Sequence, residues 1–227
     1  MNDQILDAQQ QYWNTTLSQR TDMFGVEPSE AARRAAEKFH EHGLRRLLEL
    51  GGGQGRDAVY FASQGFEVQV LDYAESAVNV LTAKAQQLGI PHRLAALQHD
   101  VRDPLPFPDG SFDACYSHML YCMALTTSQL GALSAEVLRV LRPNGVQVFT
   151  VRHTADPHYG TGTQRGEHMY EVGGFIVHFF SPEMVAQIAR GYEVLSLEQF
   201  EEGGLPRRLF LVTSRKAAAQ RLQAASK

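Results

Sequence analysis

Apolar and polar residues follow two different periods along the middle of this chain. Short, nearly continuous apolar runs have the length and composition of strands that are buried on both faces of a sheet; they cover residues 46–50, 66–71, 92–98, 112–117 and 146–151. Stretches with helical spacing of apolar positions separate them, and these predict helices through residues 58–62, 75–88 and 128–141. Strands that alternate with helices in this way predict an α/β fold, with a parallel sheet and right-handed crossovers.

The two ends of the chain depart from this alternation. Residues 3–18 have an amphipathic helical pattern, and a second helix is expected to begin with Pro28 in its first turn and to end at Gly43. Beyond Arg152, the segment 153–174 has no clear period, and its length exceeds that of most loops. A helix over 182–190 follows, and then strands over 192–197 and 207–213, which read as an antiparallel pair at the sheet edge.

These patterns predict one main domain. We expect an N-terminal helical lid or extension over residues 1–43, a ligand-binding sheet domain over 44–215 and a flexible, Ala/Gln-rich tail over 216–227. No internal repeat and no second domain are visible.

Composition narrows the class of protein. Hydrophobic residues make up 44% and charged residues 20% of the 227 residues, which is typical of a globular protein. The net charge of −4 and the lack of a basic stripe argue against a nucleic-acid substrate. No stretch approaches the ~18 apolar residues that a membrane span needs. Cys115 and Cys122 form no CxxC motif, so we expect no disulfide, no metal site and a reducing cytoplasm.

The sharpest local signal is Glu49-Leu50-Gly51-Gly52-Gly53-Gln54-Gly55, between a predicted strand and a predicted helix. Where Cβ atoms are absent, a ligand can approach the backbone closely and φ can be positive. The N-terminus of the following helix presents N–H groups to an anionic or polar ligand. Alternating glycines at such a junction favour a ligand-binding turn over an ordinary tight turn.

This turn does not by itself distinguish S-adenosylmethionine (SAM) from a dinucleotide. Gly53, Gly55 and Ala58 also satisfy G-x-G-x-x-A, the pattern for pyrophosphate binding. Asp72 ends the second predicted strand, where both ligand classes place a carboxylate for ribose hydroxyls, and it can equally cap the next helix. An NAD-dependent oxidoreductase therefore stays open as an alternative at this point.

Four segments taken together resemble the class I SAM-dependent methyltransferases. In order they are LLELGGGQGRDAVYFA, VQVLDYAESAV, LQHDVRDPLPFPDGSFDACYSHML and LRVLRPNGVQVFT. The chain resembles the small-molecule branch, which includes ubiquinone/menaquinone-biosynthesis and tellurite-resistance types, over residues 46–215. The resemblance implies a Rossmann-like sheet, mostly parallel with helices on both faces, and RLFLVTS fits its antiparallel C-terminal edge strand.

The same resemblance assigns cofactor contacts position by position in the first two segments. Glu49 would lie near the amino end of the methionine moiety, and Asp72 would hold the ribose hydroxyls, with Tyr73 packed on the adenine. Asp57 is compatible with a contact in the tellurite-type branch, and equally with a favourable charge at its helix N-terminus. The glycines that would lie against the cofactor are Gly51, Gly53 and Gly55.

The third segment would complete the SAM site. The resemblance implies that Asp100 accepts a hydrogen bond from the adenine amine and that the backbone of Val101 contacts the ring. Ser117 and His118 would face the sulfonium and its methyl group. They end the fourth predicted strand, where an open α/β sheet places its ligand.

The methyl acceptor is less well defined by the sequence. His118 and His153 are the candidate catalytic residues, because histidine can accept a proton near neutral pH and both follow predicted strands. Other candidates for the acceptor pocket are aromatic, imidazole or cationic side chains, the cations suiting an anionic acceptor; they are Tyr12, Trp13, His158, Tyr159, Tyr170, His178, Arg152, Arg165 and Arg207. Tyr12 and Trp13 suit a lid over the pocket, or equally an aromatic helix face on the core.

The leading hypothesis is an enzyme that moves the methyl group of SAM to a small molecule, by an in-line displacement that depends mainly on alignment. The alternatives are an NAD-dependent oxidoreductase and a non-catalytic SAM-binding protein. After the fourth strand, SHMLYCM stands in place of the N/D-P-P-Y/F signature of enzymes that methylate flipped bases. The accepting atom, the need for a base, the oligomeric state and the role of 153–174 stay open.

Overall fold

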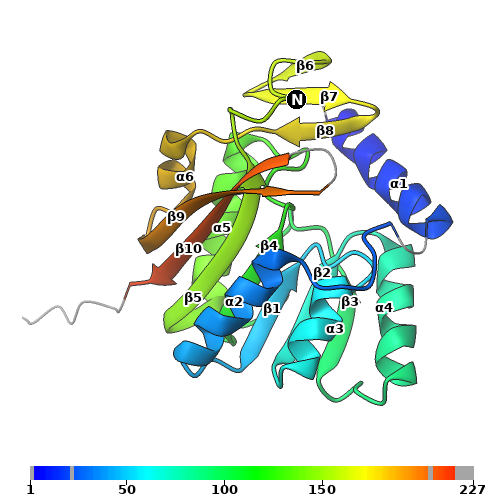
Figure 1. The fold of residues 1–227 in the computed structure, drawn as a ribbon, viewed down its shortest axis with the longest axis vertical. Coiled ribbons are helices and arrows are strands. Elements are labelled where there is room, and N and C mark those ends of the chain that lie inside the picture. Colours follow the sequence, from blue (N-terminus) through cyan, green and yellow to red (C-terminus); the bar gives the residue numbers. More distant parts are fainter. Residues whose placement is uncertain (1–2, 21–22, 204–206, 218–227) are drawn as a thin grey trace, which may run out of the picture.

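A seven-stranded sheet organises the chain, in the order β3-β2-β1-β4-β5-β10-β9 (Figure 1). The structure, a computed structural model, describes residues 3–20, 23–203 and 207–217. The parallel strands are β1 (Arg46–Leu50), β2 (Glu67–Asp72), β3 (Leu94–Gln98), β4 (Phe112–His118) and β5 (Leu141–Arg152). β10 (Arg207–Lys216) pairs antiparallel with β5 and with β9 (Tyr192–Glu202). The predicted Rossmann-like α/β fold with an antiparallel C-terminal edge is confirmed.

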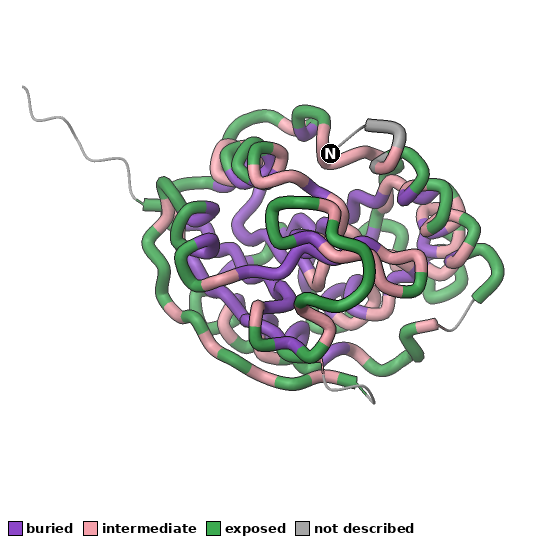
Figure 2. Tube along the Cα trace, turned by 90° about the horizontal axis from the view of Figure 1, so that it is seen from above, coloured by how far each residue is buried: buried purple, intermediate pink, exposed green. Residues whose placement is uncertain are grey.

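Helices cover both faces of this sheet, and each face has its own apolar core. Side chains alternate across a strand, so Leu47 and Leu48 of β1 enter different cores. One core packs under α2 (Glu30–Glu41), α3 (Arg56–Ser63) and α4 (Glu75–Gln87), and the other under α5 (Thr127–Val140) and α6 (Pro182–Ile188). Figure 2 shows the buried parts of the trace gathered in the middle of the molecule.

Serine, not proline, determines where α2 begins. The side chain of Ser29 accepts a hydrogen bond from Ala32 N and caps the helix, which therefore starts at Glu30. Pro28 precedes this cap, so its predicted place in the first turn is wrong.

The segment without a clear sequence period contains regular structure. β6 (Thr163–Gly166) and β7 (Met169–Val172) join β8 (Phe175–His178) in a three-stranded antiparallel sheet. Each strand has four residues, and the turns between them use positive φ at Glu167, His168 and a Gly-Gly pair. Strands this short show too few alternations for a pattern to be visible.

The N-terminal helix joins the small sheet to the large one. α1 (Asp3–Gln19) packs against α4, and Gln9 bridges the small sheet by donating to Gly174 O at 2.9 Å and accepting from Ile176 N at 3.1 Å. The Tyr12 ring meets Phe175 edge-on at 4.7 Å. Figure 1 shows α1 and the small sheet together above the carboxyl ends of the parallel strands.

The C-terminal strands are longer than the sequence pattern predicts. β10 runs to Lys216, and residues 218–227 of the predicted tail lie outside the described residues. β9 extends to Glu202, five residues past the predicted end at 197. None of the helices in the described ranges is long and apolar enough to cross a membrane.

Substitution of Gly55 by alanine tests how tightly the glycine turn is packed. The φ of Gly55 is 83°, and a Cβ there would lie 1.9 Å from Leu81 Cδ1. Gly65 has a φ of 93° with nothing within 4 Å of such a Cβ. The left-handed backbone costs either alanine variant about 1–2 kcal/mol, and we expect overpacking to cost Gly55→Ala about 1–3 kcal/mol more. Urea unfolding measures both losses, and equal losses would contradict the close packing of Gly55.

Candidate active site

The glycine turn and the predicted carboxylates open into a single cavity of about 550 Å³. It lies at the carboxyl ends of the parallel strands, where an open α/β sheet places its ligand, and it has the size of a small-molecule site. Glu49, Asp72 and Asp100 all line it, together with Gly51 and Gly53. The expected convergence of these segments is therefore found, except that Gly55 does not line the cavity and packs against Leu81 instead.

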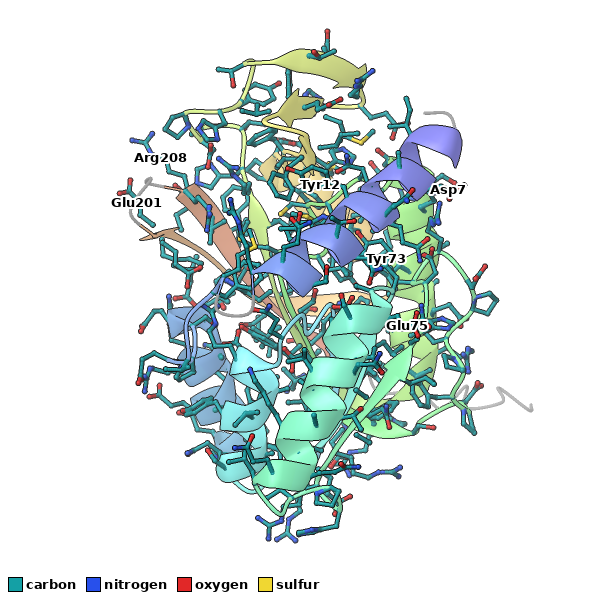
Figure 3. The ribbon with its side chains drawn as sticks, turned by 90° about the vertical axis from the view of Figure 1, so that its right-hand side faces the viewer. Asp7, Tyr12, Tyr73, Glu75, Glu201 and Arg208 are labelled. Atoms are coloured by element: carbon teal, nitrogen blue, oxygen red, sulfur yellow. The ribbon has the colours of Figure 1, made fainter. Side chains whose placement is uncertain are left out.

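The cavity is roofed by elements from outside the large sheet. Trp13 and Leu17 of α1 contribute to the lining, as do Val172, Phe175 and Val177 of the small sheet. Figure 3 shows α1 crossing in front of the strand ends, with Tyr73 beneath it. The N-terminal helix and the segment that sequence left unassigned thus enclose the site.

Asp72 holds the glycine turn in place. Its Oδ2 accepts a hydrogen bond from Gly53 N at 2.8 Å, and its Oδ1 accepts one from Ala74 N at 2.9 Å. Burial raises the pKa of Asp72, while these backbone N–H groups act in the opposite direction. A carboxylate oxygen has two lone pairs, so each can also accept from a ligand hydroxyl. The structural role and the ribose role are compatible.

Glu49 is a buried carboxylate with an unpartnered oxygen. Glu49 is only 2% exposed, and its Oε2 has no hydrogen-bond partner among the described residues. Burial, with the charge of Asp57, raises the pKa of Glu49 well above its usual range. The ionised form of such a buried carboxyl requires a cation beside it. The ammonium group of an amino-acid ligand would supply one, so the residues fit the methionine end of SAM.

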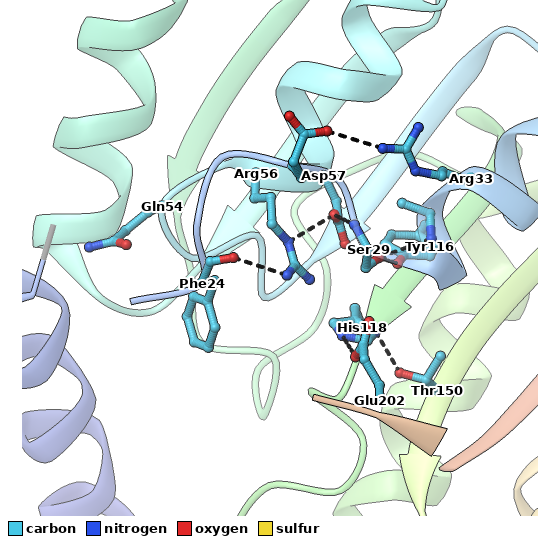
Figure 4. A network of polar contacts seen from close by, with 12 residues as sticks. Phe24, Ser29, Arg33, Gln54, Arg56, Asp57, Tyr116, His118, Thr150 and Glu202 are labelled. Carbon is cyan, nitrogen blue, oxygen red and sulfur yellow. Dashed lines mark hydrogen bonds and ion pairs between the residues drawn. The ribbon is translucent and has the colours of Figure 1, made fainter. Parts of the chain in front are cut away.

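Asp57 follows the same turn, and its carboxylate accepts hydrogen bonds from other elements of the chain (Figure 4). It accepts hydrogen bonds from Ser29 N at 2.8 Å, Ser29 Oγ at 2.7 Å and Tyr116 OH at 3.1 Å, and Arg56 Nε lies at 3.2 Å. These contacts tie α2 and β4 to the start of α3. Although Asp57 lines the cavity, its geometry favours a positioning role over direct cofactor contact.

Asp100 has a partner that the sequence analysis missed. Arg102 Nε lies 3.0 and 2.9 Å from the two Asp100 oxygens, and its Nη2 lies 2.6 Å from Oδ2 and 3.1 Å from Asp7. Burial would raise the pKa of Asp100, but the hydrogen bonds and charge of Arg102 lower it overall. The D-x-R spacing was the available signal. Val101, between them, lines the cavity as expected.

His118 reaches the cavity within a chain of hydrogen bonds (Figure 4). Its Nε2 lies 2.9 Å from Glu202 Oε2 and its Nδ1 lies 2.9 Å from Thr150 Oγ1. Thr150 Oγ1 also accepts from Met119 N at 2.9 Å, and its own O–H can donate to His118. Glu202 was missed because β9 was expected to end at residue 197. Burial would raise the pKa of Glu202, but the hydrogen bond and charge of His118 lower it.

Two predicted residues near the strand ends do not line the cavity. Ser117, next to His118, is fully buried. The ring of His153 stacks on Phe210 at 4.5 Å, and its Nδ1 accepts from Ala155 N. Burial also lowers the pKa of His153. We therefore remove His153 from the candidate catalytic residues, and Ser117 from the cofactor contacts.

Some of the residues predicted for the acceptor pocket line the cavity and others do not. Those that line the cavity are Trp13, Arg152, His158 and Arg207. The others are engaged elsewhere. The Tyr12 hydroxyl donates to Gly173 O, Tyr159 pairs with His168, Tyr170 packs on Tyr159 and Phe179, Arg165 pairs with Glu171, and the buried His178 bonds Leu125 O. Their places in the acceptor pocket are corrected accordingly.

Comparison with known proteins agrees with this geometry. A family model described as a methyltransferase domain matches residues 47–145, which hold the glycine turn, Asp72, Asp100 and His118. Over this part the chain resembles a methyltransferase domain. It is 29% identical over 123 residues to malonyl-acyl-carrier protein O-methyltransferase of Yersinia pestis, covering 53% of this chain and 42% of that protein. The chain thus spans less than half the length of this curated relative.

Solved structures share the fold of this chain. The 1,6-didemethyltoxoflavin-N1-methyltransferase of Burkholderia thailandensis, solved with S-adenosylhomocysteine (SAH), superposes with a TM-score of 0.75 at 19% identity, covering 96% of this chain and 91% of that one. The cyclase SpnF superposes with a TM-score of 0.69 at 18% identity, covering 92% and 95%.

Glu49→Gln tests the unpartnered carboxylate. The pKa of Glu49 in the fold lies above its ordinary value of 4.5, so the folded state binds the extra proton. The ligand-free protein should therefore lose stability as pH rises from 4.5 through the raised pKa. We expect Glu49→Gln to escape this loss and to be more stable at alkaline pH by about 1 kcal/mol or more.

Urea unfolding at acidic and at alkaline pH measures this difference. Glu67→Gln, at an exposed position of β2, is the control and should leave the pH dependence unchanged. A Glu49→Gln variant that is less stable than the parent at alkaline pH would show that Oε2 has a cationic partner in solution.

Proposed function

We propose that this protein binds SAM in the 550 Å³ cavity and transfers the sulfonium methyl group to a small molecule. The observation that carries the proposal is the pairing of an unpartnered buried carboxylate, Glu49, with a glycine turn held by Asp72. The first suits an ammonium group and the second suits an adenosyl ribose. The two lie on neighbouring strands, β1 and β2.

Binding is divided among the strand ends. Glu49 receives the amino group, Gly51 and Gly53 allow close approach to the backbone, and Asp72 accepts from the ribose hydroxyls. Tyr73 and Val101 supply apolar surface for the adenine, and Asp100 accepts from its amine, steadied by Arg102. α1 and β8 roof the cavity.

Bound SAM supplies a methyl group that the positive charge on sulfur has already activated. The acceptor lone pair forms a bond to the methyl carbon while the carbon–sulfur bond breaks and its electrons stay on sulfur. The contribution of the protein is alignment, with the acceptor lone pair about 3 Å from the methyl carbon and in line with sulfur. Where the acceptor carries a proton, the His118–Glu202 pair, which lines the cavity, is the candidate to take it.

A second candidate is a SAM-binding protein that does not transfer methyl groups. The likeness to the cyclase SpnF supports keeping it, because this fold hosts a protein named for a different reaction. Release of SAH in the presence of phenol, amine, thiol and halide acceptors separates the two. The comparisons lend no support to the NAD-dependent oxidoreductase.

The proposed setting is the reducing cytoplasm, with a small-molecule acceptor and neither membrane nor nucleic acid as partner.

Asp72→Ala tests the cofactor assignment. We expect it to weaken SAH binding by roughly 1–3 kcal/mol, the cost of leaving buried polar partners unsatisfied. Isothermal calorimetry measures the affinity, and the melting temperature verifies the fold. Asp103→Ala, which removes an exposed carboxylate three residues past Asp100, is the control and should bind SAH like the parent.

Two results would refute the proposal. One is the absence of SAM and SAH binding at millimolar concentration in folded parent protein. The other is an unchanged SAH affinity in folded Asp72→Ala.

A further inference from the structure

The end of the cavity away from the SAM site is rich in hydrogen-bond donors and positive charge. Along the rim of the sheet, β2 carries Asp72 and β1 carries Glu49, while Arg152 ends β5 and Arg207 begins β10. Arg152, His158 and Arg207 all line the cavity. We call these three residues the cationic end. Because β4 lies between β1 and β5, this end lies across β4 from the proposed SAM contacts.

The Asp156 carboxylate accepts four hydrogen bonds, and two of them hold the Arg152 guanidinium in place. Arg152 Nε donates to Asp156 Oδ2 at 3.0 Å and its Nη2 to Oδ1, while the backbone N–H groups of His158 and Arg208 each donate to Asp156 at 2.9 Å. Burial would raise the pKa of Asp156, but these partners lower it. The guanidinium is thereby held in one orientation, 5.2 Å from the centre of the Phe179 ring.

The same guanidinium sets the tautomer of His158. Arg152 Nη2 lies 3.0 Å from His158 Nδ1. A guanidinium can only donate, so Nδ1 accepts and the ring proton must sit on Nε2. Protonation of Nδ1 would set two donors against each other beside a positive charge. His158 therefore presents an Nε2–H donor on the cavity wall.

Arg207 is the least compensated cation of the cavity. The other three arginines in its lining each pair with an aspartate: Arg56 with Asp57, Arg102 with Asp100 and Arg152 with Asp156. No carboxylate of the described residues lies within 4.0 Å of the Arg207 guanidinium. Glu202 is opposite it in the β9–β10 register, but that carboxylate bonds His118.

An apolar wall adjoins these donors. Met123, Leu125, Val177 and Phe179 line the same cavity, and Phe179 is the ring beside Arg152. A ligand that fills this region needs an apolar body next to an anionic group. A carboxylate matches a forked guanidinium and a nearby N–H donor.

We propose that the methyl acceptor is a small carboxylic acid with an apolar body, whose carboxylate is bound by Arg207 and His158 Nε2–H. Arg152 orients His158 and adds positive charge. This inference rests on the proposed function, because the bound acid is an acceptor only if methyl transfer takes place. The carboxylate site itself can be tested without methyl transfer.

The test compares carboxylates with amides of the same shape. The probes are 3-phenylpropanoate and hexanoate, each paired with its primary amide, titrated by calorimetry into protein saturated with SAH. We expect each carboxylate to bind about tenfold more tightly than its amide, which corresponds to about 1.4 kcal/mol. Arg207→Gln should abolish most of this preference and leave the affinity for SAH unchanged.

Arg208→Gln is the matched control. Arg208 is the next residue, carries the same charge and pairs with exposed Glu201 outside the cavity lining (Figure 3). It should keep the full carboxylate preference. His158→Gln, which retains a side-chain N–H, should keep part of it, and His158→Leu should lose more.

Three outcomes would overturn the carboxylate site. They are equal affinity for carboxylates and amides, a preference that survives both Arg207→Gln and His158→Leu, and no binding of either carboxylate at millimolar concentration to protein that binds SAH. If SAH fails to bind but an Arg207-dependent carboxylate preference is measured, the proposed function fails and the carboxylate site is supported.

Discussion

The hydrogen bond from Gly53 N to the Asp72 carboxylate is the contact on which the site depends. It joins the turn after β1 to the end of β2, and the turn then becomes an anchor for other elements. The Gln54 side chain donates to the carbonyls of Leu17 and Arg20, while Lys84 donates to Gln54 O. Asp57, two residues past the turn, holds Ser29. One short turn thereby positions α1, α2 and α4.

Charge is segregated along the rim that this turn defines. Carboxylates without a cationic partner in the described structure, Glu49 and Asp72, lie on β1 and β2, whereas the cationic end lies on β5, on β10 and between them. The aspartates near Arg102 and Arg152 are satisfied by those arginines. A zwitterionic, sugar-bearing ligand and an anionic one would therefore prefer opposite ends of one cavity. That order suits a reaction between two bound molecules.

Sequence predicted the parts of this site that depend on local chemistry. The glycine turn, Asp72 and Asp100 follow strands, and parallel strands end at one rim, so their convergence was foreseeable. Partners from distant segments were not, because nothing local in the sequence marks Glu202 as a partner of His118. Ser117 and His118 could not be ranked either: β4 is buried on both faces, so alternation of polarity gives no indication of which neighbour points into the cavity.

The roof ties the two ends of the cavity together. α1 reaches the SAM side through Gln54 and through Ser76, whose backbone N–H donates to Asn14 at 3.1 Å. Its opposite side holds the small sheet through Gln9, and the Trp13 ring lies 4.8 Å from Phe175. Trp13 and Phe175 both line the cavity, so a displacement of α1 moves walls that face both ligands. If SAM binds as proposed, α1 is therefore the element through which the cofactor and the acceptor would share a wall.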